Sequence, residues 1–313
     1  MLHVQGSRDR IFDLEECFLQ SPQTAAIVQE VRSFCRQSGL PAYNPKNHRG
    51  FWRFLVLRES KHTSQMLAHL ITTDQGDPAA LKALAAHLAA NFPALTTLVH
   101  SLSRKKAQVA SGEASRILQG PGYIEEQLGG LSLRISAQSF LQTNTAAAAG
   151  LYEAVGRLGE FTGEETVWDL YCGAGSIALY LARKVRRVVG FELVPEAVND
   201  AYSNSRLNGV DNCRFLAGDL KELLKEALRT AAQPLPEVVV TDPPRSGMHP
   251  QVVQALQEIA PRRIIYVSCN PATLARDLAL LEGSYAISTI QPFDLFPHTA
   301  HIECVARLER RRG

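Results

Sequence analysis

One stretch in the second half of the chain restricts the fold more than any other feature. TVWDLYCGAGSIALYLARK (166–184) begins as an apolar strand, bends at a glycine-containing turn and continues with the periodicity of a helix. RRVVGFE (186–192) then predicts a second strand, which ends at Glu192. Two strands joined by a helix in this way lie parallel to each other in one sheet. The stretch therefore predicts the opening of a parallel α/β sheet.

The same alternation of strands and helices continues toward the C-terminus. A helix is predicted from Pro195 to Gly209, because proline favours the first turn of a helix and glycine its end. Helical stretches also follow around 220–230 and 250–260. They alternate with further strands in CRFLAGD, EVVVTDPP and RRIIYVSC. This alternation predicts a doubly wound sheet of the α/β class.

Length and composition suggest two domains in a soluble chain. The 313 residues are about twice the usual length of one domain, and we place the boundary between 1–130 and 131–313. No window approaches the roughly 18 apolar residues that a membrane span needs. The six cysteines are scattered without a C-x-x-C pair, which predicts neither a disulfide framework nor a zinc knuckle. We therefore expect a cytoplasmic protein whose thiols stay reduced.

One basic segment lies in the first part of the chain, although the net charge of +2 does not itself indicate nucleic acid. KNHRGFWRFLVLRESKH (46–62) carries five Lys and Arg residues against one acid, interleaved with Phe51, Trp52 and Phe54. This mixture suits phosphate neutralisation and base stacking on single-stranded nucleic acid. A half-exposed strand with a charged outer face is the alternative. A smaller cluster, SRKK (103–106), points weakly the same way.

The predicted strand ends carry the residues that indicate chemistry, because ligands of such sheets bind beyond the carboxyl ends of the strands. Those ends hold Asp169, Gly173, Gly175, Glu192, Asp219, Asp242 and Cys269. The turn from Gly173 to Ala178 also fits a loose dinucleotide fingerprint, with Glu192 placed to hold ribose hydroxyls. An NAD-dependent oxidoreductase is therefore one alternative. It needs neither an Asp-Pro-Pro loop nor a cysteine after the next strand.

The Asp-Pro-Pro loop favours a methyltransferase. In VVVTDPPRSG (238–247) the prolines make a rigid loop that can aim a carboxylate or carbonyl at a target base. Amino-group methyltransferases commonly have an aromatic residue where this chain has Arg245. RNA cytosine-5 methyltransferases usually carry a cysteine within the loop, and this loop has none. Because of these two departures, the sequence fits neither the amino-group nor the RNA cytosine-5 methyltransferases well.

Taken together, these motifs resemble the RNA (uracil-5-)-methyltransferases, which transfer a methyl group from S-adenosylmethionine to C5 of a uridine. The resemblance rests on the order and spacing of five stretches between residues 131 and 313. They are SFLQTN (139–144), DLYCGAGS (169–176), DPPRSG (242–247), YVSCNP (266–271) and FDLFPHTAHIE (293–303). FDLEECFLQSP (12–22) extends the resemblance back into the central domain of the family.

The chemistry of uracil explains why a cysteine is needed. C5 is too weak a nucleophile until a thiolate adds to C6 and makes an enolate, and Cys269 is the expected attacker. After methyl transfer a base must remove the C5 proton, and the resemblance assigns this role to Glu303. Taken alone, Cys269 would be a packing residue and Glu303 a surface carboxylate on an edge strand.

The resemblance also implies how the cofactor is held. Glu192 is expected at the ribose hydroxyls, Asp219 near the adenine, and Asp242 at the boundary between cofactor and target uracil. The methionine side and the turn are assigned to Gln142, Tyr171 and Ser176. His298, His301 and Glu303 also raise a zinc interpretation. Transfer from a sulfonium needs no Lewis acid, however, and their spacing is not that of a helical H-E-x-x-H motif, so no metal is expected.

Two features of many relatives have no match here. One is an N-terminal small β-barrel of the TRAM type that holds RNA. The other is an iron–sulfur cluster bound by three closely spaced cysteines before the central domain and a fourth inside it. Only Cys17 matches this set, at the fourth position, so we expect no cluster in this chain. The alternative is that an upstream segment has been lost.

These observations lead to one prediction with two alternatives. We expect a class I, Rossmann-like methyltransferase domain (131–313) behind a smaller α+β domain (1–130) that contacts RNA. The expected reaction is methylation of C5 of a uridine, with ribosomal RNA favoured over transfer RNA, by a monomer. An RNA-binding or folding module with incidental catalysis and an NAD-dependent oxidoreductase are the alternatives. The sequence does not name the uridine.

Overall fold

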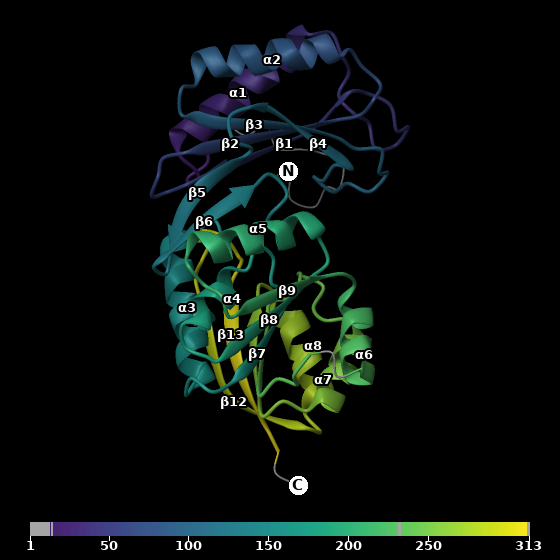
Figure 1. Ribbon diagram of the computed structural model, residues 1–313. Coiled ribbons are helices and arrows are strands. Elements are labelled where there is room, and N and C mark those ends of the chain that lie inside the picture. Colours follow the sequence, from purple (N-terminus) through teal and green to yellow (C-terminus); the bar gives the residue numbers. More distant parts are fainter. Residues whose placement is uncertain (1–12, 14, 231–232, 312–313) are drawn as a thin grey trace. The chain divides into compact units, whose positions relative to one another are not determined.

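The computed structural model describes residue 13 and residues 15–230 and 233–311 (Figure 1). The chain divides into two compact units, Met1–Ile124 and Glu125–Gly313. The sequence predicts this division after residue 130. Phe12 and Leu14, which belong to the stretch FDLEECFLQSP, lie outside the described residues.

The first unit is an α+β arrangement with helices on one face of a sheet (Figure 1). Its described part holds a four-stranded sheet in the order β1-β2-β3-β4, in which β2 and β3 are parallel and the other pairs antiparallel. The strands are β1 (Trp52–Glu59), β2 (Met66–Thr72), β3 (Leu95–Leu102) and β4 (Ala114–Gln119). Helices α1 (Pro22–Gln37) and α2 (Pro78–Asn91) pack their apolar side chains on it. Each begins with proline after a capping side chain, Ser21 and Asp77.

The basic segment 46–62 forms a loop and strand β1, which agrees with the alternative of a half-exposed strand. Two of its three aromatic residues are buried, since Phe51 is 3% and Trp52 8% exposed. They belong to the core between the sheet and the helices. The expectation that they stack on bases is therefore wrong for these two side chains, because core packing already covers their rings.

The second unit contains the predicted doubly wound sheet. Its described part holds a seven-stranded sheet in the order β12-β13-β11-β10-β7-β8-β9. The parallel strands are β7 (Thr166–Leu170), β8 (Arg187–Glu192), β9 (Cys213–Ala217), β10 (Val238–Thr241) and β11 (Arg263–Ser268). The antiparallel strands β12 (Tyr285–Phe293) and β13 (Glu303–Arg310) complete one side. The α/β fold class is thus confirmed, with an antiparallel end that the strand–helix alternation does not predict.

Helices cover both faces of this sheet, as a doubly wound fold requires (Figure 1). One group comprises α3 (Thr145–Gly159), α4 (Ser176–Ala182) and α5 (Pro195–Leu207), and the other α6 (Leu220–Thr230), α7 (Pro250–Ile259) and α8 (Pro271–Leu281). Helix α5 begins at the predicted proline and ends at Leu207, two residues before the predicted Gly209. Apolar side chains of α6–α8 and the strands form a continuous core around Trp168 and Tyr266.

A hairpin precedes the large sheet in the sequence. It consists of β5 (Tyr123–Leu128) and β6 (Leu131–Ser136), joined by Gly129 and Gly130, whose φ angles of 59° and 77° suit a tight hairpin turn. Asn204 on α5 accepts a hydrogen bond from the Arg134 amide at 2.7 Å and donates to the Arg134 carbonyl at 3.2 Å. An asparagine side chain thus fixes the hairpin to α5.

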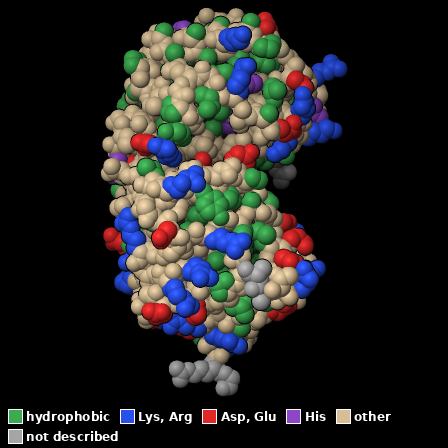
Figure 2. Space-filling view, viewed as in Figure 1, with side chains coloured by type: hydrophobic (Ala, Val, Ile, Leu, Met, Phe, Trp, Pro, Cys, Tyr) green, Lys and Arg blue, Asp and Glu red, His purple; other side chains and the backbone are tan. Residues whose placement is uncertain are grey.

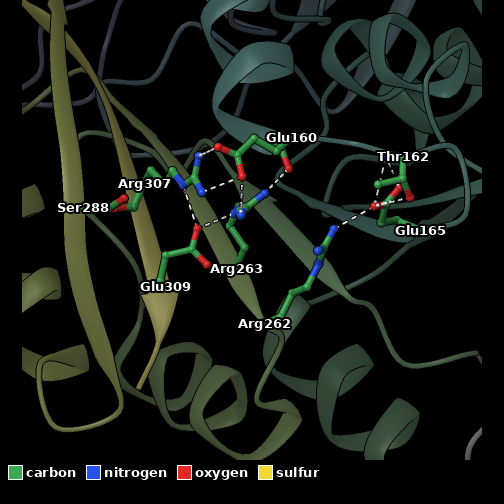
Figure 3. A network of polar contacts seen from close by, with 9 residues as sticks. Glu160, Thr162, Glu165, Arg262, Arg263, Ser288, Arg307 and Glu309 are labelled. Carbon is green, nitrogen blue, oxygen red and sulfur yellow. Dashed lines mark hydrogen bonds and ion pairs between the residues drawn. The ribbon is translucent and has the colours of Figure 1, made fainter. Parts of the chain in front are cut away.

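Where β7 and β11 begin and β13 ends, the sheet carries a network of ion pairs (Figure 3). Arg263, 5% exposed, binds Glu160 at 2.9 Å and Glu309 at 2.6 Å. Arg307 binds the same two acids, and Arg262 binds Glu165 at 2.7 Å. Every carboxylate of this network has an arginine partner.

The surface shows no single-sign charge field on the side viewed. Lys and Arg side chains are interspersed with Asp and Glu there (Figure 2). Among the described residues, no helix is long and apolar enough to cross a membrane.

Candidate active site

A cleft of about 630 Å³ opens beyond the carboxyl ends of β7 to β10 in the second unit. Tyr171, Glu192, Asp219 and Asp242 line it, one from each strand end. Its volume lies within the range of roughly 300–1,000 Å³ that small-molecule and cofactor sites occupy. The position is the one that parallel α/β sheets use for ligands.

A second, smaller cavity of about 30 Å³ lies deeper and shares Tyr171 and Asp242 with the cleft. Gln142 and Ser176 line this inner cavity, together with the buried Asp169. The two cavities therefore contain all six side chains that the sequence assigns to cofactor binding. Segments 139–144 and 169–176, which are far from residues 192–242 in the chain, meet here.

The glycine turn is held by the acid that follows the next strand. Glu192 accepts hydrogen bonds from the Gly173 amide at 3.0 Å and from the Val194 amide at 2.9 Å. Gly175 has a φ of 81°, and a Cβ there would meet Ala201 and Phe215 at 3.0 Å. A side chain at this position would be strained by its backbone angle and crowded by its neighbours.

The remaining side chains of the cleft differ in their electrostatics. A hydrogen bond from the Lys221 amide at 3.0 Å, aided by the Lys221 ammonium at 3.2 Å, lowers the pKa of Asp219. Burial raises the pKa of Tyr171 to about 12, so its phenol stays protonated at neutral pH. The cleft thus offers both an ionised acid and a neutral hydroxyl.

Cys269 and Glu303 meet on neighbouring strands. The last pair of β11 and β13 is Ser268 with Cys304, so Cys269 follows this pair on one strand where Glu303 precedes it on the other. Glu303 is 3% exposed, and its Oε2 has no hydrogen-bond partner among the described residues. Strand β13 lies between β11 and β12 and is not an edge strand. Glu303 is therefore not the surface carboxylate that it would be if taken alone.

Burial and neighbouring charges shift the pKa values of both groups. Burial raises the pKa of Glu303 to about 7, against an opposing effect of the Arg245 charge. Burial, with Glu303 and Asp242, also raises the pKa of Cys269, and Arg245 again opposes the shift. A carboxylate with a pKa near 7 can accept and release a proton at neutral pH.

Two further acids lie behind this pair. Burial, and then the charge of Glu303, raises the pKa of Asp242 to about 7. Asp169 is 1% exposed, and burial followed by the charge of Asp242 raises its pKa well above the ordinary value. The Ala178 amide opposes part of this shift, but neither Asp169 side-chain oxygen makes a hydrogen bond of normal geometry among the described residues. Acids without partners favour a cationic ligand in the inner cavity, because a positive charge would stabilise their ionised forms.

Sequence reasoning missed one residue of this site and gave no role to another. Tyr152 on α3 lines the inner cavity, and its hydroxyl lies 2.7 Å from the Ser176 hydroxyl. No motif marks it, because it is one of several buried positions of an amphipathic helix. Asp169 appears in the sequence at a strand end, but only the structure shows that its carboxylate lacks partners.

Three other residues that the sequence singled out, Cys17, His298 and His301, line neither of the two cavities. Cys17 is partly buried in the first unit. His298 and His301 are exposed, and His301 lies 3.2 Å from an Arg245 nitrogen. Within the described part of the chain, no group of three or more His, Cys, Asp or Glu side chains is arranged to hold a metal ion.

Comparison with known proteins identifies relatives along nearly the whole chain. A profile of the tRNA (uracil-5-)-methyltransferase family matches residues 82–311. An RNA methyltransferase of Nitratidesulfovibrio vulgaris is 44% identical over 99% of this chain and 68% of its own length. One of Chlorobaculum tepidum is 42% identical over 98% of this chain and 64% of its own length. This chain thus spans about two thirds of the length of these curated relatives.

A solved structure shares both the fold and part of the sequence. The tRNA (uracil-54, C5)-methyltransferase of Pyrococcus abyssi, in complex with S-adenosyl-L-homocysteine, superposes with a TM-score of 0.75. It is 30% identical to this chain, and the match covers 97% of this chain and 71% of that one. Trm5b from the same organism has a TM-score of 0.50 at 15% identity and shows likeness of fold alone.

Proposed function

Because the chain belongs to the tRNA (uracil-5-)-methyltransferase family, we propose that it transfers a methyl group from S-adenosylmethionine to C5 of a uridine in RNA through a covalent adduct with Cys269. Glu303 is the base that completes the reaction. One observation carries this assignment: a buried carboxylate without a hydrogen-bond partner on its Oε2 lies on the strand next to a half-buried thiol. Such a carboxylate is not required for packing, since burying it without partners costs free energy.

The two side chains act at different carbons of the uracil. The Cys269 thiolate adds to C6, and the electron pair of the C5–C6 bond moves toward C5 and O4. The sulfonium of S-adenosylmethionine supplies the methyl group that C5 then takes up. Glu303 accepts the proton from C5, the C–S bond to Cys269 breaks, and the thiolate leaves as the double bond re-forms. The net change replaces the hydrogen on C5 with a methyl group.

The residues of the two cavities fit the cofactor that this reaction needs. Glu192 would hold the ribose hydroxyls, Asp219 would lie near the adenine, and Asp242 would lie between cofactor and uracil. The methionine portion falls to Gln142, Tyr171 and Ser176 in and beside the inner cavity. The unpartnered Asp169 supports this placement, because a buried acid is stabilised by a cationic neighbour.

The order of the steps provides the test. Glu303→Gln leaves attack by Cys269 and methyl transfer intact but removes the proton acceptor. Incubated with substrate RNA and S-adenosylmethionine, this variant should accumulate a denaturation-resistant protein–RNA adduct that carries the transferred methyl group. Cys269→Ala should neither methylate nor form the adduct, and should still bind the cofactor.

Two outcomes would overturn the assignment. Turnover by Cys269→Ala would exclude the covalent mechanism. Normal turnover by Glu303→Gln, or inactivity without an adduct while RNA and cofactor still bind, would show that another group is the base. A thermal-shift titration of the unmodified protein with S-adenosylmethionine, S-adenosylhomocysteine and NAD separates the methyltransferase from an oxidoreductase, because only a true ligand stabilises the fold by mass action.

The RNA class is a separate part of the proposal. The sequence favours ribosomal over transfer RNA, while the Pyrococcus abyssi relative acts on a tRNA. Methylation assays with deproteinised ribosomal RNA and with total transfer RNA, followed by mapping of 5-methyluridine, distinguish the two. We keep ribosomal RNA as the proposed substrate, and label found only in transfer RNA would replace it.

We propose that the first unit (within 1–130) contacts RNA phosphates, through two loops that Arg53 joins. The Arg53 guanidinium lies 4.4 Å from the centre of the Tyr43 ring in the first loop (43–49). It also donates hydrogen bonds to the Ser103 hydroxyl at 3.1 Å and to the Ala107 carbonyl at 2.6 Å in the second loop (103–107). The two basic clusters that the sequence separates by more than 40 residues are therefore adjacent in space.

The exposed cations of these loops can be tested without disturbing Arg53. Arg49 and Lys106, one from each loop, are exposed. Arg49→Glu with Lys106→Glu should weaken RNA binding and reduce the slope of log affinity against log salt by about 2, since each phosphate contact adds roughly 0.7–0.9 to it. Lys82→Glu, at an exposed position of α2, is the matched control. An unchanged slope in the double variant would reject these loops as a phosphate-binding surface.

A further inference from the structure

Helix α8 begins two residues after Cys269, and its first residues contact the loop that carries Arg245. The Asn270 side chain caps the helix by accepting a hydrogen bond from the Ala272 amide at 3.1 Å. Its Nδ2 donates to the Arg245 carbonyl at 3.0 Å, and the Thr273 hydroxyl donates to the same carbonyl at 3.3 Å. The cap of α8 is thereby also an anchor for the backbone of Arg245.

The next turn of α8 holds the rest of the loop. Arg276 donates to the Ser246 carbonyl at 2.9 Å and to the Met248 carbonyl at 3.4 Å. Asp277 is 0% exposed and accepts hydrogen bonds at 2.7 Å from both the Met248 amide and the Tyr266 hydroxyl. The two side chains are paired with each other at 2.6 Å. Four side chains from the cap and first two turns of α8 thus bind the backbone of three residues of the loop, Arg245, Ser246 and Met248.

The backbone of the loop fits closely against this pair. Gly247 has a φ of 76°, and a Cβ there would clash with the Arg276 guanidinium and lie 2.7 Å from an Asp277 oxygen. Glycine is therefore required both by the backbone angle and by the space. A buried carboxylate such as Asp277 is tolerated only when its lone pairs have partners, and the loop amide supplies one of them.

The groups that face Cys269 make the position of this loop important. Burial and the charges of Glu303 and Asp242 raise the pKa of the Cys269 thiol, and the charge of Arg245 lowers it. Arg245 opposes the shift at Glu303 as well. Arg245 belongs to the loop that α8 holds, so a displaced loop would change the electrostatic field at the thiol.

We propose that Arg276 and Asp277 are positioning residues, which fix the loop 245–248 on α8 so that the Arg245 guanidinium stays beside Cys269 and Glu303. Nucleophile and cation are then parts of one rigid assembly, because Cys269 directly precedes the helix that holds the loop. The inference rests on the proposed function, in which Cys269 is the nucleophile. Arg276 also lines the cleft, so the test is made without RNA and cofactor.

The test measures the Cys269 thiolate without RNA or cofactor. The rate of iodoacetamide modification at Cys269, followed by mass spectrometry of its peptide, is recorded against pH for the unmodified protein and for Arg276→Ala. The apparent pKa from this profile should rise in Arg276→Ala, because the loop is released and the thiolate loses part of its neighbouring positive charge. Arg245→Ala provides the upper limit of that rise.

A double variant separates positioning from a direct charge effect. If Arg276 acts through Arg245, the variant carrying both Arg245→Ala and Arg276→Ala should show the same profile as Arg245→Ala alone. Additive shifts would mean that Arg276 acts on the thiol by its own charge. Arg276→Lys keeps the charge but lacks the planar guanidinium, whose Nε and Nη2 bind Asp277 while Nη2 reaches both loop carbonyls, so it should give a profile only partly like that of the unmodified protein. A profile identical to that of the unmodified protein would likewise overturn the proposal.

Arg229→Ala is the matched control, since this arginine is exposed and paired with Glu226 within α6. It should leave the profile unchanged. If Arg276→Ala does not fold, Thr273→Val removes one hydroxyl bond to the loop and should cause a smaller rise in the same direction. A Cys269 profile identical to that of the unmodified protein in either folded variant would reject the proposal. Failure of the proposed function is detected separately, by turnover in Cys269→Ala.

Discussion

The large sheet has one edge where its parallel strands begin and an opposite edge where they end. Across the residues that the structure describes, acidic side chains have arginine partners at the first edge and lack them at the second. Where β7 and β11 begin, Glu160, Glu165 and Glu309 are bound to arginines (Figure 3). Where the same strands end, Asp169 and Glu303 carry side-chain oxygens with no partner among the described residues. Both edges belong to one sheet and one core, so the difference lies in the partners that each edge provides.

The pKa values express this difference. Hydrogen bonds from Arg307, aided by the charges of Arg263 and Arg307, lower the pKa of Glu160 to about 2. Burial acts to raise the pKa of Glu165, but hydrogen bonds from Thr162 and the Arg262 charge leave it below its ordinary value. At the opposite edge burial raises the pKa of Glu303 to about 7. One edge stabilises the fold, whereas the other keeps its acids in a less stable state that chemistry can use.

The largest effect is expected at the paired edge. Arg263→Met should lower the free energy of unfolding by about 3–4 kcal/mol, because it removes the buried member of the ion-pair cluster and leaves Glu160 and Glu309 with Arg307 alone. Arg263 is 5% exposed and also donates to the Gly159 carbonyl, which would lose its partner. Urea unfolding measures the change. The pH profile of Cys269 modification should not move.

Arg310→Met is the control for this prediction. Arg310 lies at the end of the neighbouring strand β13, is exposed, and donates to the Ala260 carbonyl at 3.1 Å. Its loss should cost less than about 1 kcal/mol, the usual size for an exposed contact. If Arg263→Met changed the reactivity of Cys269, the two edges would be coupled and the comparison between them would fail.

The sequence predicts the sheet, and it predicts which strand-end side chains come together, for physical reasons. Strand–helix alternation defines the parallel core, and the rule that ligands bind at carboxyl ends of strands selects Glu192, Asp219, Asp242 and Cys269 in advance. Each of these residues lies at or just after the end of its own strand, so it can be identified from the local sequence. The family resemblance adds Glu303, which lies on an antiparallel strand that the alternation alone does not predict.

Contacts between distant segments are what the sequence could not supply. Nothing in KNHRGFWRF distinguishes aromatic side chains of the core from those on the surface, because both patterns alternate with cations. The hydrogen bond that Asp277 accepts from the Met248 amide joins residues 29 positions apart. Tyr152 and Asp169 acquire their roles only from the cavity that they share. Partners, and therefore pKa shifts, are properties of the folded chain.

A smaller effect of opposite sign is expected at the unpaired edge. In the folded chain the pKa of Glu303 is about 7, against an ordinary value of 4.5, so the folded state binds the proton more tightly than the unfolded state. Below pH 4.5 both states are protonated and the acid costs nothing. Stability is then lost as the pH rises from 4.5 toward 7, and the full cost applies above it.

Glu303→Gln should therefore stabilise the unliganded protein at pH 8 by about 2 kcal/mol. The shift from 4.5 to about 7 corresponds to about 3.5 kcal/mol at roughly 1.4 kcal/mol per pKa unit, and the cost of burying an amide without partners offsets part of it. The gain should vanish at pH 4. Chemical unfolding at both pH values tests this. Glu160→Gln provides the contrast, since the pKa of Glu160 is lowered: it should destabilise the protein at neutral pH, and the difference should shrink as the pH falls below 4.5. If Glu303→Gln were less stable than the unmodified protein at pH 8, the ionised Glu303 would not be lowering the stability of the fold.

The smallest effect is expected at Arg262, and it tests whether the paired edge owes its stability to burial or to the number of ion pairs. The Arg262 side chain is 47% exposed, whereas Glu165 is 4% exposed and also accepts hydrogen bonds from the Thr162 amide and hydroxyl at 3.0 Å. Arg262→Ala leaves those bonds in place, so the loss should be at most about 1 kcal/mol and should shrink further in 1 M salt. Unfolding in urea at low and high salt gives both quantities. A loss as large as that of Arg263→Met would show that the network acts as one unit in which exposure does not matter, and burial would no longer explain why this edge is the stable one.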